Sequence, residues 1–191
     1  MIKIILSDRD IKQKLKESSL EIKPLDEGNI GPSGVDLKLG YQIRVYKDMH
    51  LNVLNPFEDY NIDEITELIE PTNGKFRIKP GDLILVTCLE WLSIPRNLVA
   101  RIISRSSLSR LGIVILGTSG TVEPGFKGFL TIAIENVGRT PVILYPEMSF
   151  CQLVLETLSS SAEVSYEERR SSKYHEQKGP IPSRMFLEKK E

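Results

Sequence analysis

The chain has 191 residues and a formal net charge of -1, with 40% hydrophobic and 27% charged residues. This is enough for one globular domain with its own core, or for one domain followed by a tail. The near-neutral charge argues against nucleic acid as a partner, because phosphate-backbone binding requires a basic face. No apolar run approaches the ~20 residues that span a bilayer, so a membrane is not expected either.

Two features of the chain bear on its compartment. Cys88 and Cys151 lie in apolar, strand-like runs, which is typical of buried free thiols in a reducing environment. Residues 1–6 are too short for a secretory signal peptide and run directly into a helix cap. We therefore expect a cytoplasmic protein.

The first predicted element is a short helix, which Ser7 can cap and whose apolar face carries Ile11 and Leu15 at the i, i+4 spacing. The pattern then changes to strands, and residues 55–73 form a polar interruption that predicts a loop or a short helical insertion. The apolar or alternating runs, separated mostly by Pro or Gly, cover residues 34–39, 41–46, 83–88, 98–103, 113–116, 129–134, 142–144 and 150–155. Short strands with frequent turns and few short helices predict a mainly β fold, a distorted jelly roll or β-barrel.

The chain divides into a body and a tail. Residues 1–158 hold the N-terminal helix and the strand-like runs, whereas residues 159–191 begin with three serines and show no core-forming periodicity. The tail nevertheless carries Tyr166, Lys173 and Gln177. Aromatic and basic residues on a mobile tail suit a lid, so we interpret it as closing over a ligand site. Composition alone fits a solvated surface tail equally well.

A candidate phosphate site follows the strand-like run at residues 98–103. In Arg105-Ser106-Ser107-Leu108-Ser109-Arg110 two arginines bracket adjacent hydroxyl groups at the start of a short helix that Gly112 can end. Free N–H groups, hydroxyls and guanidinium forks together can hold a polyphosphate. After the polar residues 117–121, a carboxylate, Glu123, stands on a Pro-Gly turn. The combination is typical of a nucleotide hydrolase without a P-loop.

Several other chemistries are excluded by the residues available. Zinc-dependent deaminases need a His/Cys/Cys or Cys₃ site, whereas this chain has two histidines and two cysteines, none paired at ligand spacing. No zinc is therefore expected. Walker A, G-x-G-x-x-G and G-x-S-x-G sequences are also absent. Hydrolysis must then depend on a carboxylate acting on water, with a metal ion held on the phosphates.

The ordered motifs resemble the dCTP deaminase/dUTPase family of trimeric, zinc-independent β proteins, and the resemblance covers nearly the whole chain. The matching segments are residues 6–11, Pro32-Ser33-Gly34-Val35-Asp36-Leu37, Pro80-Gly81-Asp82, residues 105–112, Glu123-Pro124-Gly125-Phe126-Lys127-Gly128, Asn136-Val137-Gly138, residues 145–148, Gln152-Leu153, Ser172-Lys173-Tyr174 and residues 177–180. Tyr166 and residues 173–184 resemble the deaminase branch more than the classical dUTPase branch. The resemblance implies a dUTPase-like barrel, dUTP or dCTP as substrate, Mg²⁺ bound with the triphosphate, and a homotrimer with sites between subunits.

By position, the resemblance also assigns roles to individual residues. Contacts to the triphosphate fall to Arg105, Ser106, Arg110, Lys173 and Gln177, a polar contact beside the phosphates to Gln152, and further nucleotide contacts to Ser107 and Tyr166. Asp36 corresponds to an acid that supports magnesium through water. Glu123 corresponds to an Asp that meets the deoxyribose 3′-hydroxyl and, in dUTPases, activates the attacking water. Phe126 corresponds to an aromatic residue near the sugar, and the backbone of Thr131, Ile132 and Ala133 to the strand that reads the pyrimidine.

Two positions depart from the family pattern. Ala133 stands where the deaminases carry a Glu that acts as general acid and base. A methyl group cannot carry a proton, and losing such a group typically costs ~10²–10⁴-fold in rate. Glu135 lies on the same face but roughly 6–7 Å further along the strand. Glu123 replaces Asp and moves the carboxylate by one methylene, and a misplacement of about 1 Å can cost ~10²-fold.

Three hypotheses remain. The favoured one is a dUTP diphosphatase that forms dUMP and pyrophosphate, because Ala133 replaces the deaminase Glu. The alternative is a dCTP deaminase forming dUTP and ammonia, in which Ala133 is compensated by Glu135 or marks an engineered inactive variant. The third is a non-catalytic relative that binds the nucleotide. Asp36 and Glu123 also have a structural interpretation as turn residues, and Tyr166 one as a packing aromatic.

Overall fold

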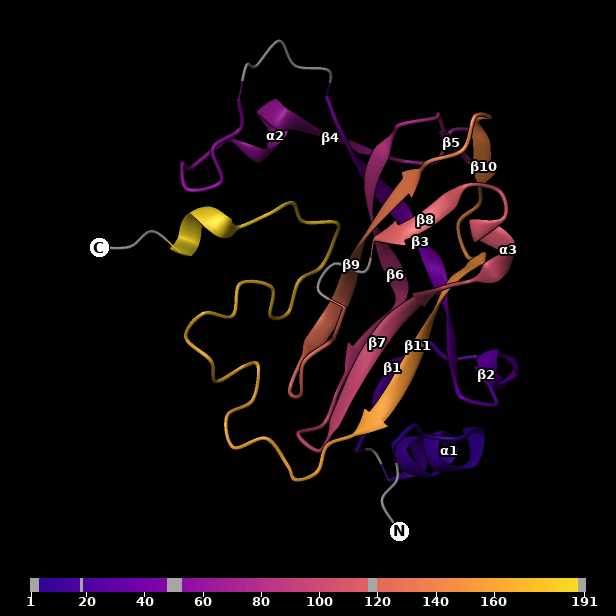
Figure 1. Ribbon diagram of the computed structural model, residues 1–191, viewed down its shortest axis with the longest axis vertical. Helices are drawn as coiled ribbons and strands as arrows, with labels where there is room; N and C mark the ends of the chain where they lie inside the picture. The colour runs from indigo at the N-terminus through magenta and orange to yellow at the C-terminus, as the bar shows by residue number, and fades with distance from the viewer. Residues whose placement is uncertain (1–3, 18, 48–52, 117–119, 189–191) are drawn as a thin grey trace.

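A computed structural model of the chain describes residues 4–17, 19–47, 53–116 and 120–188 (Figure 1). Within these ranges the main path of the large sheet runs β7–β11–β3–β6–β9–β8, and all its neighbours are antiparallel. The large sheet contains β1 (Glu21–Lys23), β2 (Ile30–Gly31), β3 (Gly34–Tyr46), β4 (Thr66–Ile69), β6 (Leu83–Ser93), β7 (Leu98–Ser104), β8 (Ile113–Leu116), β9 (Lys127–Asn136) and β11 (Ser149–Thr157). A separate pair joins β5 (Phe76–Ile78) to β10 (Val142–Leu144).

The helices are few and short. They are α1 (Asp8–Lys16), α2 (Ile62–Ile65) and α3 (Ser106–Ser109), with 3₁₀ turns at Glu27–Asn29 and Met185–Glu188. None of the helices in the described ranges has the length and apolar character that crossing a bilayer requires.

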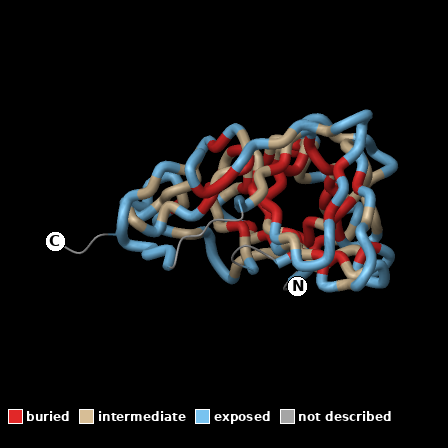
Figure 2. Tube along the Cα trace, turned by 90° about the horizontal axis from the view of Figure 1, so that it is seen from above, coloured by how far each residue is buried: buried red, intermediate tan, exposed pale blue. Residues whose placement is uncertain are grey.

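The large sheet curls until its two edge strands approach each other. The backbone N–H of Ile115 in β8 donates to Ser104 Oγ in β7 at 3.3 Å, and Ala100 in β7 forms a bridge with Val122 just before β9. Figure 2 shows buried segments on opposite sides of one interior. The mainly β fold expected from the sequence is therefore confirmed, and it takes the form of a nearly closed barrel.

Alternation along β9 decides which of its residues face the core. Ile132 and Ile134 are fully buried in the core. Thr131, Ala133 and Glu135 therefore lie on the outer face of the barrel, because successive side chains point to opposite faces of a strand. From Thr131 to Glu135, core side chains thus alternate with side chains on the outer face.

Most of the predicted elements are present, with differences in length. The N-terminal helix is capped as expected, because Ser7 Oγ accepts a hydrogen bond from the Asp10 N–H at 3.4 Å. The two alternating runs at residues 34–46 form one strand, β3, whose pairing with β6 is irregular between Leu39 and Ile43. The polar segment at residues 55–73 contains both α2 and β4. The strands β1, β2 and β5 were not predicted, because each has three residues or fewer and, unlike the wholly apolar β10, includes a charged residue or a glycine.

Both cysteines are free and buried, as the sequence predicts. Burial raises the pKa of the Cys88 thiol to about 12, and its Sγ donates to the backbone oxygen of Glu90 at 3.1 Å. Burial likewise raises the pKa of Cys151. At neutral pH both thiols are therefore protonated, and they behave as small apolar side chains.

Among the described residues, Glu90 in β6 has its carboxylate inside the barrel body. Glu90 is 1% exposed, and both its oxygens accept from the Lys38 N–H at 3.1 Å. Burial raises the pKa of this carboxyl above its ordinary value of 4.5 despite those hydrogen bonds. The folded state therefore holds the proton more tightly than the unfolded chain.

The raised pKa of Glu90 predicts a pH-dependent loss of stability. Because the folded-state value is the higher one, the contribution of Glu90 is full below pH 4.5 and is lost as the pH rises through the folded-state pKa. We expect the stability of Glu90→Gln relative to the wild type to increase with pH across this window. Urea unfolding of both proteins between pH 4 and pH 8 measures the difference, and a constant difference would contradict the assignment.

Candidate functional site

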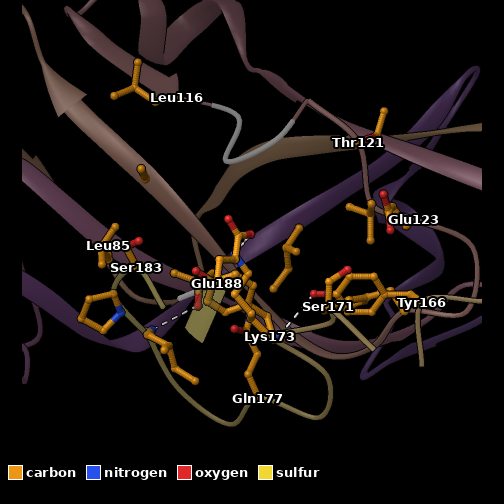
Figure 3. A pocket seen from close by; sticks show the side chains of 18 of the residues that line it. Leu85, Leu116, Thr121, Glu123, Tyr166, Ser171, Lys173, Gln177, Ser183 and Glu188 are labelled. Atoms are coloured by element: carbon orange, nitrogen blue, oxygen red, sulfur yellow. Dashed lines mark hydrogen bonds and ion pairs between the residues drawn. The ribbon is translucent and has the colours of Figure 1, made fainter. Parts of the chain in front are cut away.

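A pocket of about 660 Å³ lies on the outer face of the barrel, over β6, β8 and β9, and is bordered by the C-terminal tail. Figure 3 shows Glu123 and Tyr166 at one end, Leu85 and Ser183 at the other, and Lys173 and Glu188 between them. The side chains from the barrel are Tyr46, Leu83, Leu85, Leu116, Thr121, Val122, Glu123, Phe126, Leu130, Thr131 and Ala133, and those from the tail are Tyr166, Arg169, Ser171, Lys173, Tyr174, Gln177, Ile181, Pro182, Ser183 and Glu188.

Ala133 lies in an apolar row that crosses three strands. It pairs with Leu85 of β6 on one side and with Leu116 of β8 on the other, and all three side chains line the pocket. Residues directly opposite each other in antiparallel strands share one face. This wall of the pocket is therefore a methyl group between two leucines.

Glu135 does not replace the carboxylate missing at position 133. It lies in the next row, opposite Leu83 of β6 and Val114 of β8, and it is not among the residues that line the pocket. The acidic side chains that line the pocket, among the residues described, are Glu123 and Glu188.

Glu123 stands on the turn before β9 with a basic partner from the tail. Arg169 Nη1 lies 3.3 Å and 3.4 Å from the two carboxylate oxygens. The Arg169 and Glu123 side chains are 58% and 41% exposed, and an ion pair of this exposure contributes ~0–1 kcal/mol. The contact therefore orients the carboxylate more than it stabilises the fold.

The tail meets the barrel beside Glu123 through an aromatic pair. The Phe126 and Tyr166 ring centroids are 5.8 Å apart with the planes tilted by 52°. Burial raises the pKa of the Tyr166 hydroxyl, which accepts from the Tyr174 N–H at 3.3 Å. Gly125 has φ +85°, and a Cβ there would lie 2.5 Å from the Ser165 Cβ. The glycine therefore permits the close approach of the tail.

Further along, the tail runs beside the first half of β9. The Phe129 N–H donates to the Gln177 backbone oxygen at 3.1 Å, and Gln177 Nε2 donates to the Phe129 backbone oxygen. Thr131 Oγ1 donates to the Gly179 oxygen at 3.3 Å and accepts from the Ile181 N–H at 3.2 Å. Gln177, predicted to bind phosphate, is thereby placed in the pocket wall together with Thr131.

Lys173, the other predicted phosphate ligand of the tail, lies inside the pocket and forms an ion pair with Glu188. The Lys173 side chain is 18% exposed. Its backbone oxygen accepts from Arg184 Nη1 at 2.7 Å. A cation of the pocket is thus matched by a carboxylate of the same tail.

The remaining predicted phosphate and magnesium residues form a second group, away from the pocket lining. Arg105 Nη2 lies 3.2 Å from Asp36 Oδ2, and Gln152 Nε2 donates to Asp36 Oδ1 at 3.3 Å. Arg105 Nη1 also donates to the Ser149 backbone oxygen at 2.9 Å. This cluster joins α3 to β3 and β11, and we call it the Arg105 cluster.

The other residues of α3 are presented at the surface. Ser106, Ser107 and Arg110 are exposed, while Leu108 is buried and attaches the helix to the core. Ser106, Ser107 and Arg110 are not among the residues that line the pocket. The Ile132 side chain lies in the core, so only the backbone of this residue is available for the predicted contact with a pyrimidine. Thr118 and Ser119 lie outside the described residues.

No three side chains of His, Cys, Asp or Glu gather in a metal-binding group within the described residues. The Asp36 carboxylate has Arg105 and Gln152 as partners. A magnesium ion near Asp36 would therefore take most of its ligands from phosphate oxygens and water.

Sequence reasoning missed Leu85, Leu116, Arg169 and Glu188 as pocket residues. The two leucines could be found only from the strand register, which depends on pairs far apart in the chain. Arg169 and Glu188 belong to a charged tail whose composition does not indicate which charges face the barrel.

Comparison with known proteins gives consistent matches. Residues 5–158 match the family model described as dCTP deaminase-like. The chain is 45% identical over 188 residues to a protein of Dictyoglomus thermophilum named "dCTP deaminase, dUMP-forming", covering 97% of this chain and 96% of that one. A protein of the same name from Methanothermobacter thermautotrophicus is 41% identical over 184 residues, covering 95% and 93%.

A solved structure supports the fold. The 2′-deoxycytidine 5′-triphosphate deaminase of Agrobacterium tumefaciens superposes with a TM-score of 0.65 at 19% identity, over 83% of this chain. The match spans about half of that longer chain, 49%.

Proposed function

We propose that this chain, which belongs to the dCTP deaminase-like family and is an enzyme of the dCTP deaminase/dUTPase group, hydrolyses dUTP to dUMP and pyrophosphate without deaminating dCTP. The observation that carries the proposal is the apolar row at Ala133. Attack of water on an amino-substituted ring carbon requires a group that moves protons beside that carbon. Leu85, Ala133 and Leu116 contain no such group.

Glu123 is the residue proposed to activate water. Its carboxylate lines the pocket from the turn before β9 and is oriented by Arg169. In the proposed step, the carboxylate takes a proton from water as the oxygen attacks the α-phosphorus. The bond between the α-phosphorus and the oxygen that bridges the α- and β-phosphates breaks, and pyrophosphate leaves with the electron pair.

The phosphates are proposed to be bound by two subunits. Lys173 and Gln177 line the pocket of their own chain, whereas Arg105, Ser106 and Arg110 do not. This division supports a homotrimer in which the Arg105 cluster and α3 of one subunit complete the pocket of the next. We further propose that Mg²⁺ accompanies the triphosphate, where it would neutralise charge on the phosphate oxygens.

A second candidate function is the conversion of dCTP to dUMP, because relatives at 41–45% identity are named "dCTP deaminase, dUMP-forming". It requires a proton carrier near the pyrimidine other than residue 133. Glu188 is the other acidic residue that lines the pocket. Its carboxylate forms an ion pair with Lys173, which favours the charged form over one that carries a proton.

Product analysis separates the candidates. The protein is incubated with dUTP or with dCTP in the presence of Mg²⁺, and nucleotides, pyrophosphate and ammonia are quantified. We expect dUMP and pyrophosphate from dUTP and no ammonia from dCTP. Ammonia release from dCTP would overturn the proposal in favour of the second candidate. Binding of both nucleotides without turnover would indicate a non-catalytic relative.

A further inference from the structure

Arg44 of β3 connects the C-terminal tail to the segment inserted between β3 and β5. Its Nη1 contacts Asp63 Oδ1 at 3.0 Å and Thr66 Oγ1 at 2.9 Å. Its Nε donates to the backbone oxygen of Pro180 at 3.2 Å. The Arg44 side chain is 14% exposed, whereas that of Asp63 is 83% exposed. The hydrogen bonds to Thr66 and Pro180 are therefore the ones partly shielded from water, where such bonds are stronger. One guanidinium thus serves two segments that are more than a hundred residues apart.

A second contact between the same two segments lies at their ends. The Tyr60 and Phe186 rings meet edge to face with centroids 5.7 Å apart and planes at 72°. The Tyr60 hydroxyl also donates to the Ser183 backbone oxygen. Figure 1 shows α2 and the last 3₁₀ turn on the same side of the barrel. We call residues 54–69 the arm. The clamp is the set of contacts by which Arg44 of β3 and Tyr60 of the arm hold the tail.

The stretch of tail held by the clamp forms one wall of the pocket. Ile181, Pro182 and Ser183 line the pocket between the two clamp contacts. Tyr174 is joined to this stretch, because its hydroxyl accepts from the Arg184 N–H at 2.9 Å. Lys173 is joined to it as well, because Arg184 Nη1 donates to its backbone oxygen. Release of the clamp would therefore free the part of the tail that places Lys173.

We propose that Arg44 and Tyr60 are positioning residues, which hold the tail closed on the pocket so that Lys173 and Gln177 reach the phosphates of the nucleotide. The inference rests on the proposed function for its effect on substrate, but the clamp itself is a contact within the chain. Neither Arg44 nor Tyr60 lines the pocket, so their effect must pass through the tail.

The expected effect follows from the fraction of molecules with a closed tail. If only closed molecules bind the nucleotide productively, the apparent dissociation constant is the intrinsic constant divided by the closed fraction. A variant that is closed a tenth of the time should thus show a KM about tenfold higher. Its kcat should change much less, because saturating substrate draws the tail back into place.

The first test compares Arg44→Gln and Arg44→Lys with Arg77→Gln as control. Arg77 is an exposed residue of β5 with no part in the clamp. For dUTP we expect both Arg44 variants to raise KM about tenfold, because an ammonium cannot reproduce the fork that reaches arm and tail together. Recovery of the wild-type KM by Arg44→Lys would mean that only the positive charge matters, and would overturn the proposal.

Limited trypsin digestion provides a readout that does not depend on activity. Lys178 and Arg184 are cleavage sites on the clamped stretch, and cleavage of a transiently opened segment follows its open population when closing is fast. Intact-mass analysis should show faster cleavage there in both Arg44 variants than in Arg77→Gln. Equal cleavage rates would show that Arg44 does not hold the tail. If the wild type does not turn over dUTP, the proposed function is wrong, but the comparison of cleavage rates still tests the clamp.

A second test uses the aromatic contact, in case the Arg44 variants fold poorly. Tyr60→Ala and Phe186→Ala remove opposite halves of one contact, so the double variant should raise KM and tail cleavage no more than the stronger single variant. Effects that multiply in the double variant would show that the two rings act independently, and would contradict the clamp. Tyr60→Phe keeps the ring pair and should fall between the wild type and Tyr60→Ala.

Discussion

Glu123→Gln is expected to lower kcat for dUTP hydrolysis by about 10²–10⁴-fold, the range for loss of a positioned general base. The amide has nearly the shape of the carboxylate and can still accept a hydrogen bond from Arg169, whose Nη1 lies 3.3 Å from the Glu123 carboxylate. Nucleotide affinity should therefore change little. Steady-state kinetics and calorimetric titration with a non-hydrolysable dUTP analogue measure the two effects.

Glu123→Asp is the matched control for position 123. It keeps the charge and withdraws it by one methylene, so its kcat reports how far the hydrolysis depends on the reach of this side chain. Retention of more than a tenth of wild-type kcat by Glu123→Gln would show that another group activates the water.

Ala133→Glu is expected to release ammonia from dCTP, where the wild type should release none, because the variant supplies the missing proton carrier. The new carboxylate would stand between Leu85 and Leu116, the residues that pair with position 133. Desolvation there raises the pKa of a carboxyl, which favours a group that can both take and return a proton near neutral pH. Ammonia released from dCTP, followed by a coupled assay, measures the gain.

Ala133→Gln controls for size and polarity at the same position, because an amide fills the same space without titrating. It should release no ammonia. If Ala133→Glu folds and binds dCTP but releases none, the wall at position 133 does not face the reacting carbon, and the argument against deamination in the wild type would fail with it.

The local patterns of the sequence were sufficient for the barrel but not for the pocket. Ser7, Ile11 and Leu15 specify α1 within one turn or two, and alternation identifies strands such as β8 and β9. These signals depend on neighbours in the chain. The strand β4 follows α2 without a break inside a polar segment, so neither shows a period long enough to read.

The site combined residues that could be anticipated with others that could not. Glu123, Phe126, Tyr166, Lys173 and Gln177 share the pocket, as expected for parts of one site. Arg105 and Arg110 were predicted for the same site, with sites between subunits, and within a single chain they lie away from the pocket lining. The partner of Glu123 was also not foreseen, because nothing local relates Arg169 to a turn 46 residues earlier.

The alternation along β9 has a consequence for how such a protein can diverge. Ile132 and Ile134 belong to the interior, whereas Ala133 lines the pocket. An exchange at Ala133 leaves the core side chains in place and so avoids the cavities and overpacking that cause the largest losses of stability. A lineage could therefore gain or lose a reaction at residue 133 by a single codon change, while the scaffold that carries it stays under separate selection.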